Sequence, residues 1–311
     1  MYADIDQALS VPTLRFEVEL EPAQGTRFQP TNFPDLGPAT YSRPDGTEML
    51  LVESPQSMAN RLEEVCWNHE RADLHDVLTG LPYVRINLGN GLFTNSILEA
   101  HRLNSPYILE SSDKTFMTAL IQEFKEFEMS PVDVRKVARV VFKYDPNSVL
   151  HGVFFAKSDL AGGRIRLTRA LSSFIEAEGV NVAESGGVKM DVVNPRGDTS
   201  KGFGHVPFHR TEFTASRITA YFSLDNALIK GYSLGETAEK LLCALALWKV
   251  RKFLDSGLRL RTNCDFQVKD REKIEIPELR YLEEILPGLI KKCAEEGLFA
   301  MPPVTEVQWK Q

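Results

Sequence analysis

Two kinds of segment are missing from this 311-residue chain: a long apolar run and a closely spaced cysteine pair. No apolar stretch approaches the roughly 18 to 20 residues that cross a bilayer, and the first six residues are acidic where a signal peptide would be basic. We therefore expect a cytoplasmic globular protein with no membrane partner. The four cysteines are far apart, which indicates buried reduced thiols rather than a zinc knuckle or a disulfide scaffold.

Strong catalytic signatures are missing as well. The sequence has no G-x-S-x-G nucleophile elbow and no H-E-x-x-H zinc motif, and the run from Gly197 to Gly202 lacks the spacing of a P-loop. His205 and His209 lie four residues apart, but Gly204 just before them and Pro207 between them disfavour the helix on which that spacing would chelate a metal. We predict no metal, no cofactor and no enzymatic activity. A histidine that acts as general acid or base in RNA cleavage stays open, with His101, His151, His205 and His209 as the candidates.

The net charge of −7 is low for a nucleic-acid protein, but it is unevenly distributed. Residues 1–130 hold 20 acidic against 9 basic residues, whereas residues 131–311 hold 23 against 27. The densest basic cluster runs from Arg135 to Arg169 and includes Arg164 and Arg166. One face of such a molecule can hold a phosphate backbone while the other meets the basic face of a neighbour. Solvated charge on unrelated helices is the alternative.

Hydrophobic spacing predicts a mixture of strands and helices over one domain, residues 1–311. Period-two alternation or β-rich composition marks strands at 14–20, 49–52, 137–144, 151–156, 218–224 and 259–268. Helical spacing marks 54–67, 113–129, a segment closing at 179, 233–256 and 278–296. Residues 26–48 are rich in Gly and Pro and are expected to form a long loop insertion. The mixture predicts an α+β fold of the ferredoxin-like type, with Arg259 and Arg261 on an open sheet face.

The helix expected after Ser54 has a surface suited to phosphate. Ser54 and Pro55 are typical of an N-cap followed by proline in the first helical turn. Apolar residues at helical spacing face the sheet, which leaves Gln56, Ser57, Asn60 and Arg61 on the remaining surface. These polar groups near the positive end of the helix dipole favour an anion. An ordinary polar helix face is the alternative.

The stretch from Lys201 to Phe208 is the most distinctive in the chain. Compared with the first ribonucleoprotein pattern of RNA-recognition domains, it differs only at His205, where Phe is expected. Pro207 argues against a central strand, so we predict a loop or an edge hairpin. A tight turn whose glycines supply positive φ is the alternative.

Several stretches together resemble one known family. They are residues 27–37, 51–63 and 186–210, supported by 244–250 and 257–262. In combination they are similar to the Cascade backbone subunits of CRISPR systems, the Cas-seven family of the RAMP superfamily, and most closely to its type I-G branch, formerly I-U.

The resemblance implies a modified RNA-recognition fold shaped like a hand, with a thumb hairpin over residues 186–214. It implies a non-catalytic subunit that polymerises with copies of itself along a CRISPR RNA, joins other Cascade subunits and presents the guide for pairing with target DNA. The RNA-binding residues it implies are Arg27, Gln29, Ser54, Gln56, Ser57, Asn60, Arg61, Arg164, Arg166, Lys189, Arg196, Lys201, Phe203, His205, His209, Arg210, Arg259 and Arg261. Two alternatives are an endoribonuclease of the same superfamily that processes repeat RNA and a metabolic α+β enzyme.

Overall fold

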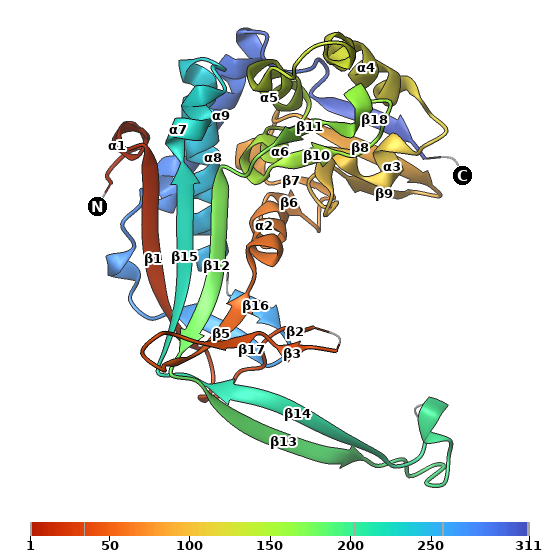
Figure 1. Ribbon diagram of the computed structural model, residues 1–311, viewed down its shortest axis with the longest axis vertical. Coiled ribbons are helices and arrows are strands. Elements are labelled where there is room, and N and C mark those ends of the chain that lie inside the picture. The colour runs from red at the N-terminus through yellow and green to blue at the C-terminus, as the bar shows by residue number, and fades with distance from the viewer. Residues whose placement is uncertain (1, 34, 202, 257, 310–311) are drawn as a thin grey trace.

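A curled antiparallel sheet forms the centre of the computed structural model, which describes residues 2–33, 35–201, 203–256 and 258–309 (Figure 1). Its strand order is β16-β17-β1-β15-β12-β5-β4. The strands are β1 (Thr13–Pro22), β4 (Thr40–Ser42), β5 (Glu48–Glu53), β12 (Leu171–Glu178), β15 (Arg217–Asp225), β16 (Leu258–Arg261) and β17 (Cys264–Val268). Every neighbouring pair in this sheet is antiparallel.

The core of the sheet has ferredoxin-like connectivity. The core elements come in the chain order β1, helix α2 (Pro55–Glu64), β12, β15, helix α8 (Glu236–Asp255) and β17. Strands β4 and β5 are inserted before α2, a hairpin between β12 and β15, and β16 before β17. In space β1 lies between β17 and β15, and β12 lies on the far side of β15. A strand-helix-strand unit repeated in this way, with the two halves interleaved, is the split βαβ arrangement. The predicted α+β class is therefore confirmed.

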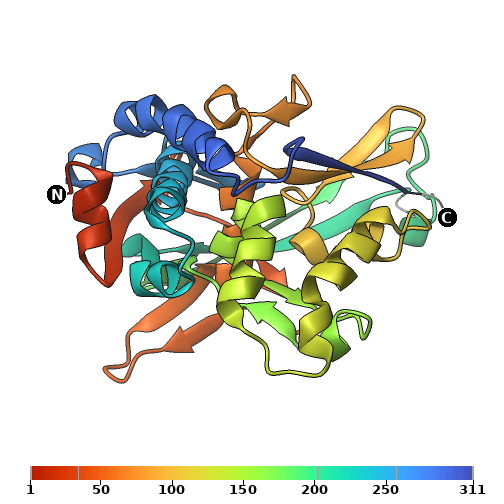
Figure 2. The same cartoon turned by 90° about the horizontal axis from the view of Figure 1, so that it is seen from above.

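The two faces of the sheet differ in burial. Residues of β12 alternate between buried and partly exposed along the whole strand. The buried face packs with α8, whose residues 241–248 are all buried, as their apolar composition predicts. Helix α9 (Leu279–Glu295) lies beside α8, as Figure 2 shows, and short helices α1 (Ile5–Ser10) and α7 (Asn226–Gly231) also contact α8. The opposite face of the sheet carries the partly exposed side chains.

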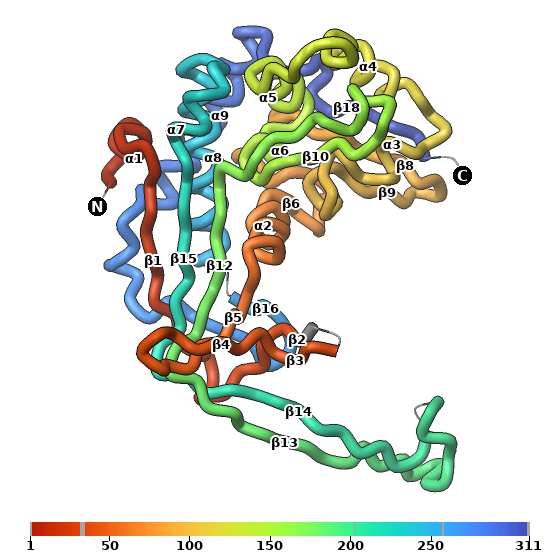
Figure 3. The backbone as a smooth tube through the Cα atoms, in the orientation of Figure 1, coloured from red at the N-terminus to blue at the C-terminus, as the bar shows by residue number. Residues whose placement is uncertain are grey.

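Between α2 and β12 the chain builds a second region, here called the insertion lobe, residues 65–170. It contains α3 (Pro106–Leu109), α4 (Thr115–Phe124), α5 (Val134–Tyr144), α6 (Pro146–His151), β6 (Trp67–Asn68), β7 (Asp73–Leu74), β8 (Tyr83–Gly89), β9 (Leu92–Asn95), β10 (Val153–Phe155) and β11 (Ile165–Leu167). The C-terminal strand β18 (Val304–Gln308), which sequence spacing did not predict, returns to pair in parallel with β8. Figure 3 traces this return of the chain to the lobe.

Several predicted elements proved wrong, the first at residues 137–144. This segment is helix α5 rather than a strand, because Val137, Val140, Val141 and Tyr144 follow helical spacing and are all buried. The Asp133 side chain caps the helix by accepting from the backbone N–H of Arg135. The packing of an amphipathic stripe outweighs the β propensity of valine. Residue 151 likewise ends a helix, and only 153–155 of the strand expected at 151–156 is a strand.

The helix expected to close at Gly179 is also wrong. Residues 171–178 form β12, in which Leu171, Ser173, Ile175 and Ala177 are buried and alternate with partly exposed neighbours. Residues 259–268 form a hairpin, β16 and β17, rather than one strand, and Asn263 takes a left-handed φ of 56° at its turn. The 26–48 loop contains β2 (Asn32–Phe33), β3 (Gly37–Pro38) and β4, where no regular structure was expected before residue 44.

Within the described ranges, every helix is too short or too polar to span a bilayer. The four cysteines are buried and free, as predicted. Short 3-10 helices lie at Asp76–Leu78, Arg102–Asn104, Lys125–Glu128, Ala161–Gly163, Thr199–Lys201 and Arg271–Lys273. Residue 34 of the 27–37 stretch, Gly202 of the 201–208 stretch and residue 257 of the 257–262 stretch fall outside the described residues.

Candidate nucleic-acid interface

Helix α2 has the polar surface that its sequence predicts. The hydroxyl of Ser54 accepts from the backbone N–H of Ser57 at 3.2 Å, so this serine is an N-cap. Met58 and Leu62 are buried, whereas Gln56 and Asn60 are exposed and Ser57 is half-buried. The helix therefore presents amide and hydroxyl groups to solvent along one stripe.

A pocket of about 660 Å³ opens beside the first turn of α2. We call it the arginine pocket. The Arg169 guanidinium donates to Oε1 of Gln56 at 3.1 Å and to the carbonyl of Pro55 at 2.8 Å. These two bonds join the segment just before β12 to helix α2. Arg166, exposed on β11, lies in the same lining. The full lining is Gln56, Ala100, His101, Arg102, Asn104, His151, Gly152, Val153, Phe154, Arg166, Leu167, Arg169 and Ser172. None of these residues is acidic, so the pocket suits an anion.

A buried polar network supports the floor of the arginine pocket. Arg102 makes a bidentate ion pair with Glu63, at 2.6 and 2.8 Å, and also donates to the carbonyl of Gly152 at 3.2 Å. Arg102 is 5% exposed and Glu63 is 1% exposed. The pair thus joins the buried side of α2 to the insertion lobe and holds the backbone that lines the pocket.

Lys249 of α8 completes this network. Its ammonium lies 3.0 Å from Nε2 of His151, and both side chains are buried. Burial and, next, the charge of Lys249 lower the pKa of His151 well below its usual value, so the imidazole is neutral. Since the ammonium can only donate, the imidazole proton lies on Nδ1, which has no hydrogen-bond partner among the described residues. A buried imidazole of this kind is poorly suited to the acid or base role that the alternative hypothesis required.

Gly152 connects this network to the pocket, and its replacement gives a testable prediction. The residue has φ 80° and ψ 154°, and a Cβ there would lie 2.9 Å from the carbonyl oxygen of Leu167. Gly152→Ala is expected to lower the free energy of unfolding by about 2–4 kcal/mol, from backbone strain plus the clash. The measurement is urea unfolding. Gly46→Ala is the matched control, because Gly46 has φ 87° but no atom within 4 Å of a Cβ. Equal losses in the two variants would contradict the packing argument.

At the other end of α2, two arginines predicted to bind RNA are engaged inside the protein. The Glu53 side chain is fully buried and accepts from Arg61 at 3.0 Å and from Arg261. Arg61 also donates to the carbonyl of Leu260 at 2.5 Å. Each guanidinium side chain is only 23% exposed. Arg261 therefore does not lie free on an open sheet face, because the curled sheet brings β16 next to the end of β5.

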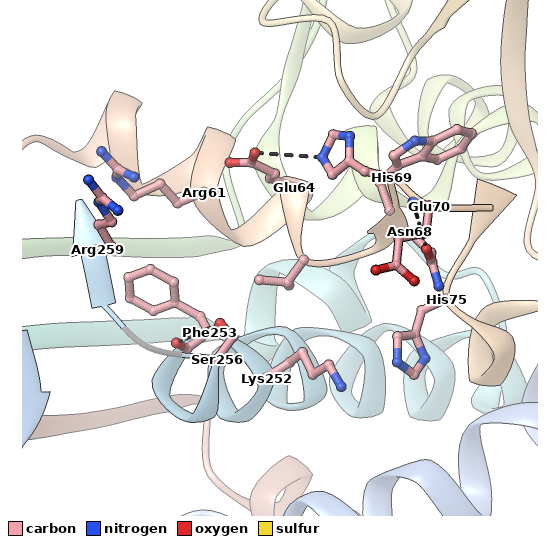
Figure 4. Close-up of a pocket in the computed structure, with 12 residues that line it drawn as sticks. Arg61, Glu64, Asn68, His69, Glu70, His75, Lys252, Phe253, Ser256 and Arg259 are labelled. Carbon is pink, nitrogen blue, oxygen red and sulfur yellow. Dashed lines mark hydrogen bonds and ion pairs between the residues drawn. The ribbon is translucent and has the colours of Figure 1, made fainter. Parts of the chain in front are cut away.

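A second pocket, of about 470 Å³, lies beyond this cluster (Figure 4). Arg61 and Arg259 lie at one end of it, and Lys252 and His75 lie at the other. Glu64 and Glu70 also line it, and Glu64 approaches His69 at 3.8 Å. Arg259 is exposed and approaches Asp265 at 3.7 Å. The mixed charge makes this pocket less suited to a polyanion than the arginine pocket.

Residues 181–214 form a two-stranded hairpin that leaves the body of the protein (Figure 1). Strands β13 (Asn181–Lys189) and β14 (Val206–Thr214) pair in register along their whole length, with Pro207 opposite Val188. Lys189 and Arg196 are exposed and have no acidic partner within the described part of the chain. Lys201 lies 3.9 Å from Asp198, and the Arg210 guanidinium sits 5.4 Å from the centre of the Phe208 ring.

Asp191 organises the tip of this hairpin. Its carboxylate accepts from the backbone N–H groups of Val193, Asn194 and Gly204 at 2.9 to 3.0 Å. These bonds lower the pKa of Asp191. Nδ1 of His205 accepts from the backbone N–H of Asp191 at 3.2 Å, while Phe203 is 56% exposed. His209 lies further down the hairpin, 3.7 Å from Glu184.

Glu212 anchors the base of the hairpin. It is 5% exposed and accepts from Arg27 at 3.1 Å, from Ser185 at 3.0 Å and from Asn263 at 3.3 Å. The backbone N–H of Gln29 donates to the carbonyl of Asn263 at 2.7 Å. The start of the 26–48 segment thus braces the hairpin, and Arg27 is ion-paired rather than free.

Four of the eight cations in residues 135–169 are ion-paired, and Arg139 is exposed. Arg135, Lys136, Lys143 and Lys157 pair with Asp133, Glu126, Glu123 and Glu110, respectively. Arg164 donates to the carbonyls of Ala161 and Phe127. Arg166 and Arg169 are the members of this cluster that reach the arginine pocket. Sequence analysis placed Arg166 among the candidates but missed Arg169, for which membership of the basic cluster was the available signal.

Among the described residues, no group of three or more His, Cys, Asp or Glu side chains could hold a metal ion. The interface that the fold does assemble consists of the exposed stripe of α2, the arginine pocket and the projecting hairpin.

Comparisons with known proteins place the chain in a family. The family model of CRISPR-associated protein GSU0053 matches residues 14–182, which is more than half of the chain. One similar solved structure is a "CRISPR RNA-guided surveillance complex, pre-nicking"; the matching chain is 14% identical, the match covers 81% of this chain and 72% of that chain, and the TM-score is 0.40. No curated protein matches. The chain belongs to the family of CRISPR-associated protein GSU0053.

Proposed function

We propose that this protein is the guide RNA-binding backbone subunit of a type I interference complex, of the Cas-seven family and its I-G branch. In this role it polymerises along a CRISPR RNA and presents the guide for pairing with target DNA. Its partners are the RNA, further copies of itself and other Cascade subunits. The family assignment supports a CRISPR role, and the geometry of the interface supports the finer proposal.

The observation that carries the proposal is the projecting hairpin. Beyond its base, which Arg27 and Asn263 hold through Glu212, this arm of two nine-residue strands exposes cations together with Val192, Val193 and Phe203. Exposed apolar residues interleaved with cations fit a partner that offers both rings and phosphates. Single-stranded RNA, backed by a neighbouring subunit, has that chemistry.

The α2 stripe and the arginine pocket supply a second contact. Their groups are amides, hydroxyls and guanidinium groups, which are among the groups that contact phosphate and sugar. Contacts of this kind with the RNA backbone accept any spacer sequence, because base pairing reads the target.

Co-expression with a CRISPR array and the other complex subunits tests the proposal. We expect co-purified RNA of defined length in a multi-subunit particle, seen as a raised absorbance ratio at 260 nm and as fast sedimentation. A monomeric protein without bound RNA under these conditions would contradict the proposal.

The proposed role is non-catalytic, and a cleavage assay tests that part separately. Labelled repeat RNA incubated with the purified protein should stay intact. His101, exposed in the lining of the arginine pocket, is the residue to replace if cleavage is seen. Cleavage by the wild type that His101→Ala abolishes would instead establish an endoribonuclease.

A further inference from the structure

The open face of the central sheet carries a pair of stacked aromatic rings. Phe174 on β12 and Tyr221 on β15 are directly opposite in the strand register. Their ring centres are 4.9 Å apart and their planes are inclined by 24°. Both side chains belong to the partly exposed set, so one side of the pair faces solvent at the middle of the sheet.

A separate hollow of about 430 Å³ lies over these rings. Arg15 of β1 and the hydroxyl residues Ser172 and Ser223 line it together with the two rings. Arg15 is exposed and has no acidic partner among the described residues. Glu17 lines it as well, so the hollow combines an apolar floor, two hydroxyl groups, the cation of Arg15 and one carboxylate, which is paired with Arg217.

The carboxylates around this hollow are already engaged. Glu17 pairs with Arg217 at 3.2 Å, and Glu176 accepts from the hydroxyl of Tyr41 at 2.7 Å. Burial, and next the bond to Glu176, raise the pKa of Tyr41 to about 12, so the phenol remains a donor. Because Glu17 and Glu176 already have partners, they repel an anionic ligand less than two free carboxylates would.

Ser172 connects this hollow to the arginine pocket, because it lines both. Arg169 and Arg166 lie on the far side of Ser172, and the aromatic pair begins two residues further along β12. The rings therefore lie next to cationic groups, as the base of a nucleotide lies next to its phosphate.

We propose that Phe174 and Tyr221 form a stacking site for one base of single-stranded RNA, with the adjoining phosphate held near Arg15 and the arginine pocket. Every base has a ring face, so this stacking tolerates any sequence. An aromatic side chain of a protein partner would also fit the rings, but it would leave Arg15 and the arginine pocket without an anion. The proposal rests on RNA binding by this protein and adds a contact that neither α2 nor the hairpin supplies.

Fluorescence of short single-stranded RNA carrying 2-aminopurine tests the stacking directly. Stacking on the rings should quench the probe when wild-type protein binds. Phe174→Leu keeps an apolar side chain but removes a ring, and it should abolish position-specific quenching and weaken binding by about tenfold or more. Phe174→Tyr keeps the ring and should restore both. Arg15→Gln should weaken binding while leaving the quenching of the saturated complex intact. The matching DNA is the second probe, and thermal unfolding confirms that each variant is folded.

Four outcomes test this proposal against the broader one. If folded Phe174→Leu binds and quenches like wild type, the stacking site is overturned while RNA binding stands. If Phe174→Leu keeps its RNA affinity but loses another complex subunit, the face belongs to a protein and the proposal is also overturned. If wild-type protein binds neither RNA nor DNA, both proposals fail together. Quenching with DNA at equal affinity would contradict the choice of RNA.

Discussion

Replacing Arg102 by methionine is expected to lower the free energy of unfolding by about 3–5 kcal/mol at neutral pH. The change leaves the Glu63 carboxylate buried without its bidentate partner, and it also frees the carbonyl of Gly152. Loss of one partner of a buried pair is costly because the remaining group either stays charged without compensation or takes up a proton and loses its hydrogen bonds. Arg71→Met is the control, since the ion pair of Arg71 with Asp76 is exposed and should contribute less than about 1 kcal/mol.

The pH dependence identifies the cause of this loss. Burial raises the pKa of Glu63 from 4.5 to about 7, against the opposing effect of Arg102. A raised native pKa favours folding fully below pH 4.5, and that benefit disappears as the pH rises through 7. Without Arg102 the native pKa rises further, so the deficit relative to wild type should be smallest near pH 5 and largest near pH 8.

Urea unfolding at these two pH values measures the difference. The double variant Glu63→Leu with Arg102→Met should recover much of the loss, because it removes the buried charge as well as its partner. A deficit that is the same at both pH values would show that lost packing of Arg102, rather than the unpaired carboxylate, is responsible.

The second large effect is expected at the hairpin. Replacing Lys189, Arg196, Lys201 and Arg210 together by alanine should weaken RNA binding by roughly two orders of magnitude at low salt. If each cation contacts one phosphate, the slope of log affinity against log salt should become shallower by about 3. The loss should be equal for unrelated guide sequences, because phosphate contacts carry no sequence information.

Filter binding or fluorescence anisotropy over a range of salt concentrations measures both quantities. The matched control removes four cations at a surface remote from the hairpin. It replaces Arg271, Arg280, Lys291 and Lys292 on α9 and on the segment that precedes it. A similar loss of RNA affinity in the control would show that the protein's net charge, rather than the hairpin, causes the effect. A strongly sequence-dependent loss would contradict recognition through the backbone.

Local signals in the sequence predicted the elements that depend on near neighbours. The Ser54 cap and the apolar stripe of α2 lie within a few turns of chain, and the first strand shows clear alternation, so both were predicted correctly. The errors arose where two local signals competed. Residues 137–144 combine β-branched composition with helical spacing, and the spacing prevailed because it buries one continuous face.

The candidate site was less predictable, because its charges are assigned by contacts between distant residues. Arg61 and Arg261 looked like free cations in the sequence, but the curled sheet brings both to Glu53. Arg27 is directed to Glu212 in the same way. Conversely, Lys249 looked like an ordinary member of an apolar helix, although it lies against His151 beneath the arginine pocket.

The sequence by itself determined the α+β class, the polar stripe of α2 and the unusual composition of residues 186–210, because period, capping and turn chemistry act over a few residues. Only the tertiary structure decided which cations remain available. It paired four of the eight cations of the 135–169 cluster with carboxylates, left Arg166 and Arg169 together beside Gln56, and placed Phe174 against Tyr221 on an open face. The physical reason is that a charge or a ring is available for binding only after folding has assigned its partners, and those partners lie up to about two hundred residues away.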